Sequence, residues 1–159
     1  MIFGTTTEYA IRGIAELEIK SGGKPVLLNE MLDGTDLPRE FMAKVMQRLV
    51  KAGLLLSSKG RGGGFKLARA PHEIRMMDVL IAMEGADRPG QCVLGFSRCN
   101  DAMPCAQHDL YKPIRQGLNE YLQNTTVADL AASLRQKRAR SKSLPVAGKV
   151  RSMRRATTQ

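Results

Sequence analysis

Apolar residues recur at helical spacing along much of the first part of the chain. Between Tyr9 and Lys20 they mostly return every three or four positions, which predicts an amphipathic helix that ends at the Ser-Gly-Gly of residues 21–23. A short second helix is expected over 29–33, and a tight turn separates it from a third helix over 38–52. The third helix has one apolar stripe and a basic open face, so the pair forms a helix-turn-helix pattern. The stripe consists of Met42, Val45, Met46 and Leu49.

The pattern changes to extended segments directly after the third helix. Residues 54–58 and 65–68 are predicted to be two strands, joined by a glycine-rich tip over 59–64. A β-hairpin in this position is typical of the wing of a winged helix-turn-helix domain. A fourth helix is expected over 76–83, whereas residues 86–106, which hold all the cysteines, show no periodicity. A loop of this length in a compact domain is usually functional or disordered.

A long amphipathic helix follows this loop and ends near Asn124. Thr126 and Asp129 then resemble a capping box, which predicts a last short helix ending at Leu134. The apolar face of the long helix consists of Leu110, Ile114, Leu118, Tyr121 and Leu122. From residue 135 onward Lys, Arg, Ser, Thr and Pro dominate, which predicts a disordered basic tail.

The fold class expected from these elements is mainly α with a small β-hairpin wing. The predicted division is a winged helix-turn-helix domain over 1–85, a cysteine-rich loop over 86–106, a long helix with a short C-terminal helix over 107–134, and the basic tail over 135–159.

Charge narrows the choice of partner. The 159 residues include 25 Lys and Arg against 15 Asp and Glu, a formal net charge of +10, which favours a polyanion such as DNA, RNA or an anionic membrane surface. Aromatic residues make up only 4% and tryptophan is absent, which argues against stacking platforms for single-stranded nucleic acid. No stretch approaches the roughly 18 apolar residues of a membrane span, and the N-terminal residues lack a secretion-signal pattern. We therefore expect a cytoplasmic protein without a membrane partner.

The third helix and the wing supply the candidate DNA-reading residues. A recognition helix directs polar side chains to base edges in the major groove, and the candidates are Arg39, Glu40, Ala43, Lys44 and Gln47. Glycines at a wing tip permit close backbone approach, and a neighbouring cation can enter a narrow minor groove. The wing candidates are Lys59, Arg61, Gly62 and Gly63. A solvated helix face and a plain tight hairpin are the alternatives.

Cys92, Cys99 and Cys105 are the only cysteines, and His108 lies three residues after the last of them. Thiolates gathered this closely in a reducing compartment usually hold a metal or an iron–sulfur cluster rather than disulfides. A cluster is favoured over zinc, because structural zinc sites usually contain cysteine pairs at closer spacing. A metal-free thiol switch and three unliganded cysteines are the alternatives.

An enzyme is not expected. The sequence contains neither a GxSxG nor an HExxH motif. Cys105 and His108 are the one plausible nucleophile–base pair, and a loop rich in cysteine is a poor preorganised site for catalysis.

The order of these features resembles a known family, the Rrf-type winged-helix regulators that include IscR, NsrR and RirA. The resemblance spans about residues 1–134. It rests on short motifs in a fixed order, which are EYA at 8–10, AGL at 52–54, RGGGF at 61–65, DV at 78–79, the cysteine loop with CAQH at 105–108, and TTVADL at 125–130.

This resemblance implies a homodimer, paired through the long helix, that binds a pseudo-palindromic operator in double-stranded DNA. It also implies an iron–sulfur cluster on Cys92, Cys99 and Cys105 that controls operator affinity as a redox sensor. His108 matches the histidine ligand of IscR-like [2Fe–2S] proteins, and Glu8 matches the acidic ligand that NsrR-like relatives contribute from the partner subunit. His108 is favoured as the fourth ligand, and with it a [2Fe–2S] cluster over a [4Fe–4S] cluster.

Two positions depart from the family pattern. Six residues separate Cys92 from Cys99 and five separate Cys99 from Cys105, so the first gap is longer than in IscR and the cluster type stays open. Ala43 stands where IscR has a glutamate that helps to select its sites, so the operator sequence does not carry over.

The resemblance leaves the biological context open. Iron supply, nitric oxide, oxidants and cysteine status all fit as the signal, and both repression and activation fit as the output. A metal-free thiol-switch regulator of the same fold and a non-specific nucleic-acid-binding protein are the alternative functions.

Overall fold

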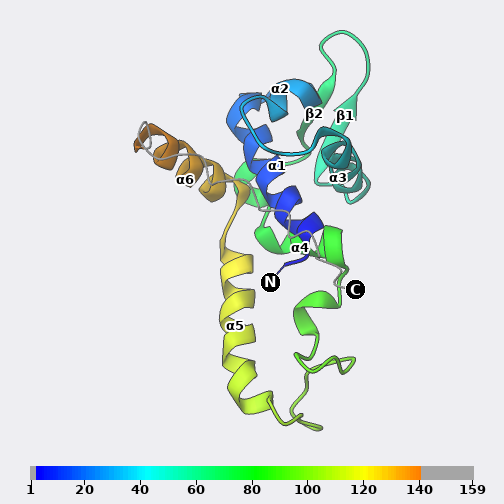
Figure 1. Ribbon diagram of the computed structural model, residues 1–159, viewed down its shortest axis with the longest axis vertical. Coiled ribbons are helices and arrows are strands. Elements are labelled where there is room, and N and C mark those ends of the chain that lie inside the picture. The colour runs from blue at the N-terminus through cyan, green and yellow to red at the C-terminus, as the bar shows by residue number, and fades with distance from the viewer. Residues whose placement is uncertain (1–2, 141–159) are drawn as a thin grey trace, which may run out of the picture.

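The structure is a computed structural model that describes residues 3–140. Figure 1 shows a body of helices and a β-hairpin, from which α5 extends as a long arm beside an irregular loop. No helix within the described range is long and apolar enough to span a membrane. The elements in chain order are α1 (Thr5–Ser21), α2 (Leu28–Leu32), α3 (Arg39–Lys51), β1 (Leu55–Ser58), β2 (Gly64–Leu67), η1 (Pro71–Glu73), α4 (Met76–Glu84), η2 (Arg88–Gly90), α5 (His108–Asn124) and α6 (Val127–Arg140).

The core of the body lies between α1, α3 and α4 and continues under the strands. Helices α1 and α3 approach closely, because a Cβ atom on Gly13 would lie only 2.3 Å from Cε of Met42. The apolar stripe predicted for the third helix is fully buried, which confirms that α3 packs on this core. Each large apolar side chain buried in this way contributes about 1.5–3 kcal/mol. The fully buried side chains include Ile14, Leu17, Met31, Met42, Met46, Leu49, Leu55 and Ile74.

Helices α2 and α3 form the predicted helix-turn-helix, and α1 and α4 hold it in place. The Lys20 ammonium group of α1 donates to three backbone carbonyls between residues 30 and 33, at 2.6–3.0 Å. A cation there satisfies carbonyls at the end of α2 that have no partner inside the helix. Arg48 of α3 donates to the Met83 carbonyl at 2.7 Å and so joins α3 to the end of α4.

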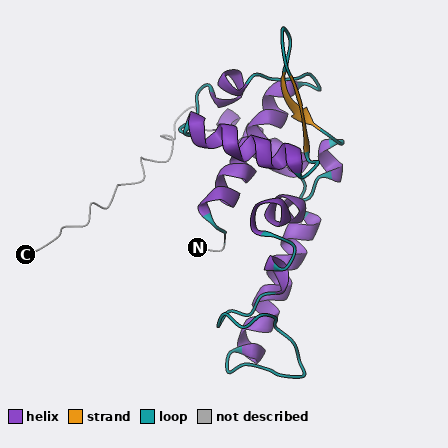
Figure 2. Ribbon diagram, turned by 90° about the vertical axis from the view of Figure 1, so that its right-hand side faces the viewer, coloured by secondary structure: helices purple, strands orange, loops and turns teal. Residues whose placement is uncertain are grey.

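The predicted wing is an antiparallel pair of strands, with Ser58 opposite Gly64 at the tip end. Val26 extends this pair, since Val26 and Phe65 exchange two backbone hydrogen bonds of 2.9 Å. The contact requires glycine at position 64, where φ is 140° and a Cβ atom would lie 2.3 Å from the Val26 carbonyl oxygen. Figure 2 shows the strands rising from the helices with the tip farthest from the body. A mainly α fold with a hairpin wing is therefore confirmed.

A short extended link at residues 125–126 attaches α5 and α6 to the body. Two backbone hydrogen bonds of 2.9 Å hold it there, from the Met76 N–H at the start of α4 to the Thr125 carbonyl and from the Val127 N–H to the Ile74 carbonyl. The capping box predicted at Thr126 and Asp129 is present, since the Thr126 N–H donates to the Asp129 carboxylate at 2.9 Å and the Asp129 N–H donates to the Thr126 hydroxyl at 3.2 Å. The Thr126 hydroxyl also donates to the Asp129 carboxylate at 2.6 Å, and this hydrogen bond together with the one from the Thr126 backbone holds the pKa of Asp129 below its ordinary value.

The prediction that the last helix ends at Leu134 is wrong, because α6 continues to Arg140. Arg138 forms an ion pair with Glu16 of α1, whose side chain is only 5% exposed. Arg135 donates to the carbonyls of Glu18 and Ile19 at 3.3 Å each, near the end of α1. Arg, Gln and Lys are good helix formers, and cations are favourable in the last turn. Residues 135–140 are thus helical, and the rest of the predicted basic tail lies outside the described residues.

Most other predicted ends differ from the observed ends by one residue, with one larger difference. Helix α1 begins at Thr5, ahead of the predicted start at Tyr9. The cause is a long-range contact, because the Glu84 carboxylate accepts hydrogen bonds from the Gly4 N–H and the Thr7 hydroxyl. A contact between residues so far apart in the chain leaves no periodic signal in the polar residues of this first turn.

Candidate DNA-binding face and cysteine loop

The open face of α3 carries the residues predicted to read bases. Glu40, Lys44 and Gln47 are exposed and share one face at helical spacing, whereas Ala43 is half-buried beside them. Arg39 is also exposed, but its guanidinium donates to the side-chain carbonyl of Asn29 in α2. Arg39 therefore links the two helices of the helix-turn-helix, a contact that sequence spacing alone did not predict.

The wing tip separates the predicted wing residues into two groups. Lys59, Arg61 and Gly62 are exposed at the tip, where φ of Gly62 is 76°. Gly63 is instead buried, and a Cβ atom there would lie 2.5 Å from the Ser58 carbonyl oxygen. Gly63 thus allows the hairpin to close, while the two cations are presented to solvent in reach of a polyanion.

The cysteine loop brings its three thiols and one imidazole together. Cys92 is buried, Cys99 and Cys105 are half-buried, and His108 is buried as the first residue of α5. The Cys92 and Cys105 sulfurs are 3.5 Å apart, and the Cys99 sulfur lies 3.4 Å from Nδ1 of His108. All four line one cavity of about 10 Å³, about the space of a single water molecule.

His108 is oriented by a hydrogen-bond chain on its far side. Its Nε2 lies 2.7 Å from Asp101 Oδ1, which also accepts a 2.6 Å hydrogen bond from Lys112. The Lys112 hydrogen bond and then the His108 hydrogen bond hold the pKa of Asp101 below its ordinary value. With a hydrogen on Nε2 donated to this carboxylate, the Nδ1 lone pair of a neutral imidazole faces Cys99 and the cavity. This is the orientation that a metal-ligating histidine requires.

Cys92 has an environment that favours its thiolate. The hydrogen bond from the Leu94 backbone holds the pKa of Cys92 below its ordinary value against the opposing effect of burial. Hydrogen bonds from the Cys105 thiol and the Phe96 backbone and the positive charge of Arg115 also lower the pKa of Cys92. A lowered thiol pKa increases the fraction of thiolate, which is the form that binds metals and attacks oxidants.

The donor set fits an iron–sulfur cluster in its chemistry. Thiolates and imidazole are the ligands that such clusters take. Within the described residues, no three such side chains are already arranged about a single metal position. Glu8, the other predicted ligand, is half-buried in the first turn of α1 and does not line the cysteine cavity.

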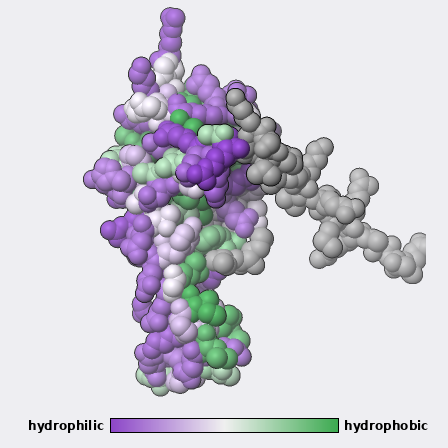
Figure 3. Space-filling model, turned by 90° about the vertical axis from the view of Figure 1, so that its left-hand side faces the viewer, coloured by the Kyte–Doolittle hydropathy of each residue, from purple (hydrophilic) through white to green (hydrophobic). Residues whose placement is uncertain are grey.

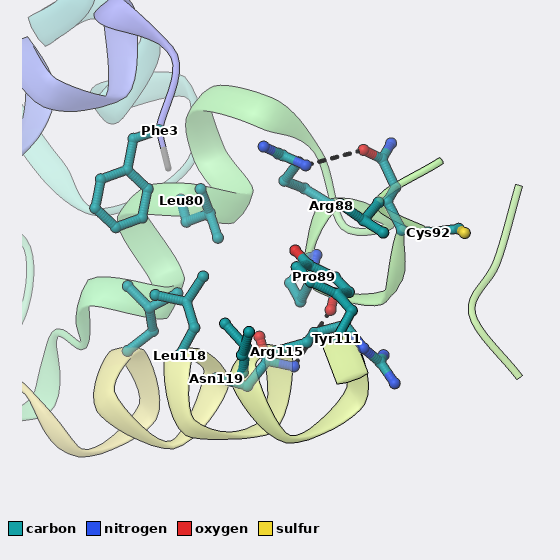
Figure 4. A pocket seen from close by; sticks show the side chains of 13 residues that line it. Phe3, Leu80, Arg88, Pro89, Cys92, Tyr111, Arg115, Leu118 and Asn119 are labelled. Carbon is teal, nitrogen blue, oxygen red and sulfur yellow. Dashed lines mark hydrogen bonds between the residues drawn. The ribbon is translucent and has the colours of Figure 1, made fainter. Parts of the chain in front are cut away.

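Glu84 connects the loop to the DNA-binding body, and sequence reasoning missed it. Its Oε1 accepts from the Gly4 N–H at 2.8 Å and the Thr7 hydroxyl at 2.6 Å, while its Oε2 accepts from Nε of Arg88 at 2.6 Å. Arg88 also donates to the side chain of Gln91, next to Cys92, as the upper dashed line of Figure 4 shows. The only local signal was the spacing of four between Glu84 and Arg88, which suits an ion pair on one helix face.

A larger cavity of about 360 Å³ lies between α4, η2 and α5 (Figure 4). Phe3, Leu80 and Leu118 line one side of it. Cys92 and Arg115 line another part, and Nε of Arg115 is buried without a hydrogen-bond partner among the described residues. Cys92 therefore borders both cavities, and its position depends on how α5 packs against α4.

The arm has an apolar surface that no other part of the described chain covers. Figure 3 shows apolar side chains gathered along one side of its lower end. On α5 the predicted apolar face is divided, since Leu122 is buried against α4 whereas Leu110 and Ile114 are 71% and 65% exposed. The exposed apolar residues of this surface are Val93, Leu94, Phe96, Met103, Leu110, Ile114 and Tyr121. Val93, Leu94, Leu110 and Ile114 lie around one hollow of this surface, and an exposed apolar patch of this kind is typical of an interaction site.

A winged helix-turn-helix with a basic tip and an exposed recognition-helix face defines a DNA-binding transcription regulator. Residues 3–133 match the Rrf2 family, described as iron-dependent transcriptional regulators, and the chain belongs to this family. The resemblance inferred from the sequence motifs is thereby confirmed.

Individual relatives agree with this assignment. An HTH-type transcriptional regulator of Aquifex aeolicus is 32% identical over 132 residues, which cover 82% of this chain and 91% of the relative. The HTH-type transcriptional regulator IscR of Vibrio campbellii is 25% identical over 77% of this chain and 72% of its own length. The solved structure of CymR, the global cysteine regulator of Bacillus subtilis, has a TM-score of 0.68 and 27% identity, and covers 82% of this chain and 96% of CymR.

Proposed function

We propose that this chain is a homodimeric transcription regulator whose affinity for its operator is controlled by an iron–sulfur cluster on Cys92, Cys99, Cys105 and His108. The observation that carries the proposal is the convergence of three thiols and a correctly oriented imidazole on one cavity. Membership of a family described as iron-dependent regulators supports it. When bound, the cluster supplies a centre that exchanges electrons and that oxidants can dismantle.

His108 is the fourth ligand in this proposal, and a [2Fe–2S] cluster is favoured. Asp101 and Lys112 hold the imidazole with Nδ1 toward the thiols, so little rearrangement of His108 is needed. Glu8 of the partner subunit is the alternative ligand. Histidine and glutamate both bind iron less tightly than a thiolate, which suits a sensor that must change or lose its cluster.

The loop acts on the DNA-binding body through Glu84. A change at Cys92 alters the segment from η2 to Gln91, and Arg88 of this segment binds the Glu84 carboxylate. The same carboxylate fixes the first turn of α1, and α1 packs directly on α3. The state of the cluster therefore biases the position of the recognition helix through one short set of contacts.

Operator DNA is bound by α3 in the major groove and by the wing in the minor groove. Glu40, Lys44 and Gln47 are assigned to bases and Lys59 and Arg61 to the wing contacts. Because Lys and Arg release counterions from phosphates, binding is expected to weaken steeply with salt. An affinity for DNA that depends neither on the state of the cluster nor on the DNA sequence would instead support a general nucleic-acid-binding protein.

The second subunit packs on the apolar surface of the arm. Leu110 and Ile114 protrude from α5, and Val93 and Leu94 extend the surface onto the loop immediately after Cys92. A second copy of this chain presents the same surface, so a two-fold pair of arms buries both. Two winged domains then address two half-sites of a pseudo-palindromic operator.

The test is anaerobic purification followed by visible absorption, iron and sulfide analysis, and native mass spectrometry. We expect a coloured dimer that carries iron and sulfide. Cys99→Ala should lose the cluster, whereas Ser97→Ala, an exposed residue of the same loop, should keep it. DNA selected from a random pool by the wild-type dimer should be bound differently before and after cluster removal. A colourless protein that anaerobic iron and sulfide cannot reconstitute would rule out the cluster.

A metal-free thiol switch is the second candidate function. The close approach of two thiols favours it, and so does the structural similarity to CymR, which is named a global cysteine regulator. In that case the same Cys99→Ala and Ser97→Ala variants would both be colourless like the wild type. DNA affinity would respond to a thiol oxidant without any iron in the sample.

A further inference from the structure

The four donors of the cysteine loop fall into two pairs rather than one equivalent set. The first pair is Cys92 with Cys105, whose sulfurs are 3.5 Å apart. The second is Cys99 with His108, whose sulfur and Nδ1 are 3.4 Å apart. His108 is in turn held by Asp101, so the second pair is fixed from the far side of the ring. Three cysteines allow three disulfides, and this geometry distinguishes one of them from the other two.

The geometry points to a regulatory disulfide between Cys92 and Cys105 in the metal-free protein, with Cys99 left as a thiol. The two sulfurs need to approach by about 1.5 Å to reach the S–S length of about 2.05 Å. Residues 91–107 between η2 and α5 contain neither helix nor strand, so side-chain rotation and a small loop adjustment suffice. Cys99 is held elsewhere, because its N–H donates to the Gly90 carbonyl at 3.0 Å and its sulfur contacts the imidazole.

The oxidation balances with hydrogen peroxide as the oxidant. One thiolate attacks a peroxide oxygen, the O–O bond breaks, and a sulfenic acid and one water form after the hydroxide takes a proton. The second thiol then attacks the sulfenic sulfur, the S–S bond forms, and a second water leaves. In total two thiols and one peroxide give one disulfide and two waters, and a small dithiol reverses the change. Reversible disulfides of this kind are the type that occurs in reducing compartments.

This disulfide rests on the proposed function only in that it uses the same cysteines. It adds an oxidised, metal-free state to the regulator. With Cys92 and Cys105 joined, the loop retains one thiol and the imidazole, which is too few ligands to rebuild a cluster. Cluster loss under peroxide would therefore be followed by a closed loop that stays closed until a reductant opens it. The regulator would then respond to thiol reductant as well as to iron and sulfide.

The pairing can be read directly by mass spectrometry of the full-length metal-free protein. The protein is treated with hydrogen peroxide, alkylated, and digested without reduction by trypsin together with a protease that cleaves before aspartate. This digestion places the cysteines on three separate peptides, 87–98, 99–100 and 101–108. We expect peptide 87–98 to be linked to peptide 101–108 within one chain, and the Cys99 peptide to be alkylated.

Variants separate this inference from the cluster proposal. Cys99→Ser should lose the cluster and keep the disulfide, whereas Cys92→Ser and Cys105→Ser should lose both. A disulfide that involves Cys99, a link between two chains, or no link at all would overturn the inference, even if the wild-type protein loads a cluster. A Cys92–Cys105 link in a protein that never loads a cluster would support the inference and contradict the cluster.

Discussion

The contact most open to a quantitative test is Glu84, because both of its carboxylate oxygens are occupied. The side chain is only 17% exposed and joins α1 to η2 across the end of α4. Glu84→Gln keeps the size and shape but leaves one acceptor oxygen for donors on two sides. We therefore expect the substitution to loosen both the first turn of α1 and the attachment of the cysteine loop.

The size of the effect follows from the three donors. A hydrogen bond to a charged group contributes about 1.5–3 kcal/mol, but the Gly4 N–H and Arg88 are partly in solvent, where such pairs contribute about 0–1 kcal/mol. Gly4 and Thr7 share Oε1 and can still donate to the amide oxygen of Gln, so the loss comes from the missing charge on these hydrogen bonds and from the lost Arg88 pair, and we expect a total of about 1–2 kcal/mol. For a chain of this size each kcal/mol lowers the melting temperature by about 2–4 °C, so Glu84→Gln should melt about 2–8 °C lower.

The effect should depend on pH in a defined direction. Burial opposes ionisation of Glu84, but the hydrogen bonds from Thr7, Gly4 and Arg88 together with the charge of Arg88 hold its pKa below the ordinary value of 4.5. A lowered carboxyl pKa in the folded state stabilises the protein above the unfolded pKa, and this stabilisation is lost as pH falls through the folded pKa. The gap between wild type and Glu84→Gln should thus narrow as pH falls below about 4.5.

The assay is thermal unfolding followed by circular dichroism, at neutral pH and at acid pH. Glu120→Gln, which removes an exposed carboxylate from α5, is the matched control and should melt with the wild type. Equal melting temperatures of Glu84→Gln and wild type at neutral pH would refute the reasoning. So would a difference that persists unchanged at acid pH, since the missing charge could not then be its cause.

Three further predictions concern the wing, α6 and the arm. Gly64→Ala should lower the free energy of unfolding in urea by about 1–3 kcal/mol, because its Cβ would lie 2.3 Å from the Val26 carbonyl oxygen at a φ of 140°. An unchanged urea midpoint would contradict the close contact between Val26 and β2. Arg138→Met should cost about 1–3 kcal/mol by leaving the Glu16 carboxylate buried without its partner, and adding Glu16→Leu should recover part of that loss. Ile114→Glu should convert the proposed dimer into folded monomers in light scattering, since this side chain is 65% exposed within one chain. An intact dimer would exclude this surface as the subunit contact.

The body of the protein could be predicted from sequence because its signals are local. Both main patterns can be read from a short stretch of chain. One is the apolar stripe of α3, from Met42 to Leu49, and the other is the glycine-rich tip between two short apolar runs. The capping box at Thr126 is equally local, and it is present as predicted. Where a helix end depends on a distant partner, the prediction was wrong, as for α6, which Glu16 of α1 extends beyond Leu134.

The candidate site was predictable in its members but not in its pairing. Spacing alone placed three cysteines in one loop with His108 three residues beyond the last of them, which was enough to indicate a metal or cluster. Which thiol faces which is determined by the return of the loop to the start of α5, where His108 is held by Asp101. Apart from its spacing of four to Arg88, Glu84 gave no signal in the sequence, because its other partners, Gly4 and Thr7, lie at the other end of the winged domain in sequence.

In the proposed dimer, the position of Cys92 would let a change at one sulfur reach both the subunit contact and the DNA-binding body. Upstream, Gln91 receives a hydrogen bond from Arg88, which leads through Glu84 to α1. Downstream, Val93 and Leu94 belong to the exposed apolar surface of the arm. The proposed cluster or disulfide at Cys92 would fix a backbone segment next to both, and the separation of the two winged domains of the proposed dimer would then change together with the seating of each recognition helix. A bound group can shift the equilibrium between two arrangements of the winged domains only if it favours one of them over the other. A cluster or disulfide attached at Cys92 would have this preference because it would restrict the segment that both contacts share.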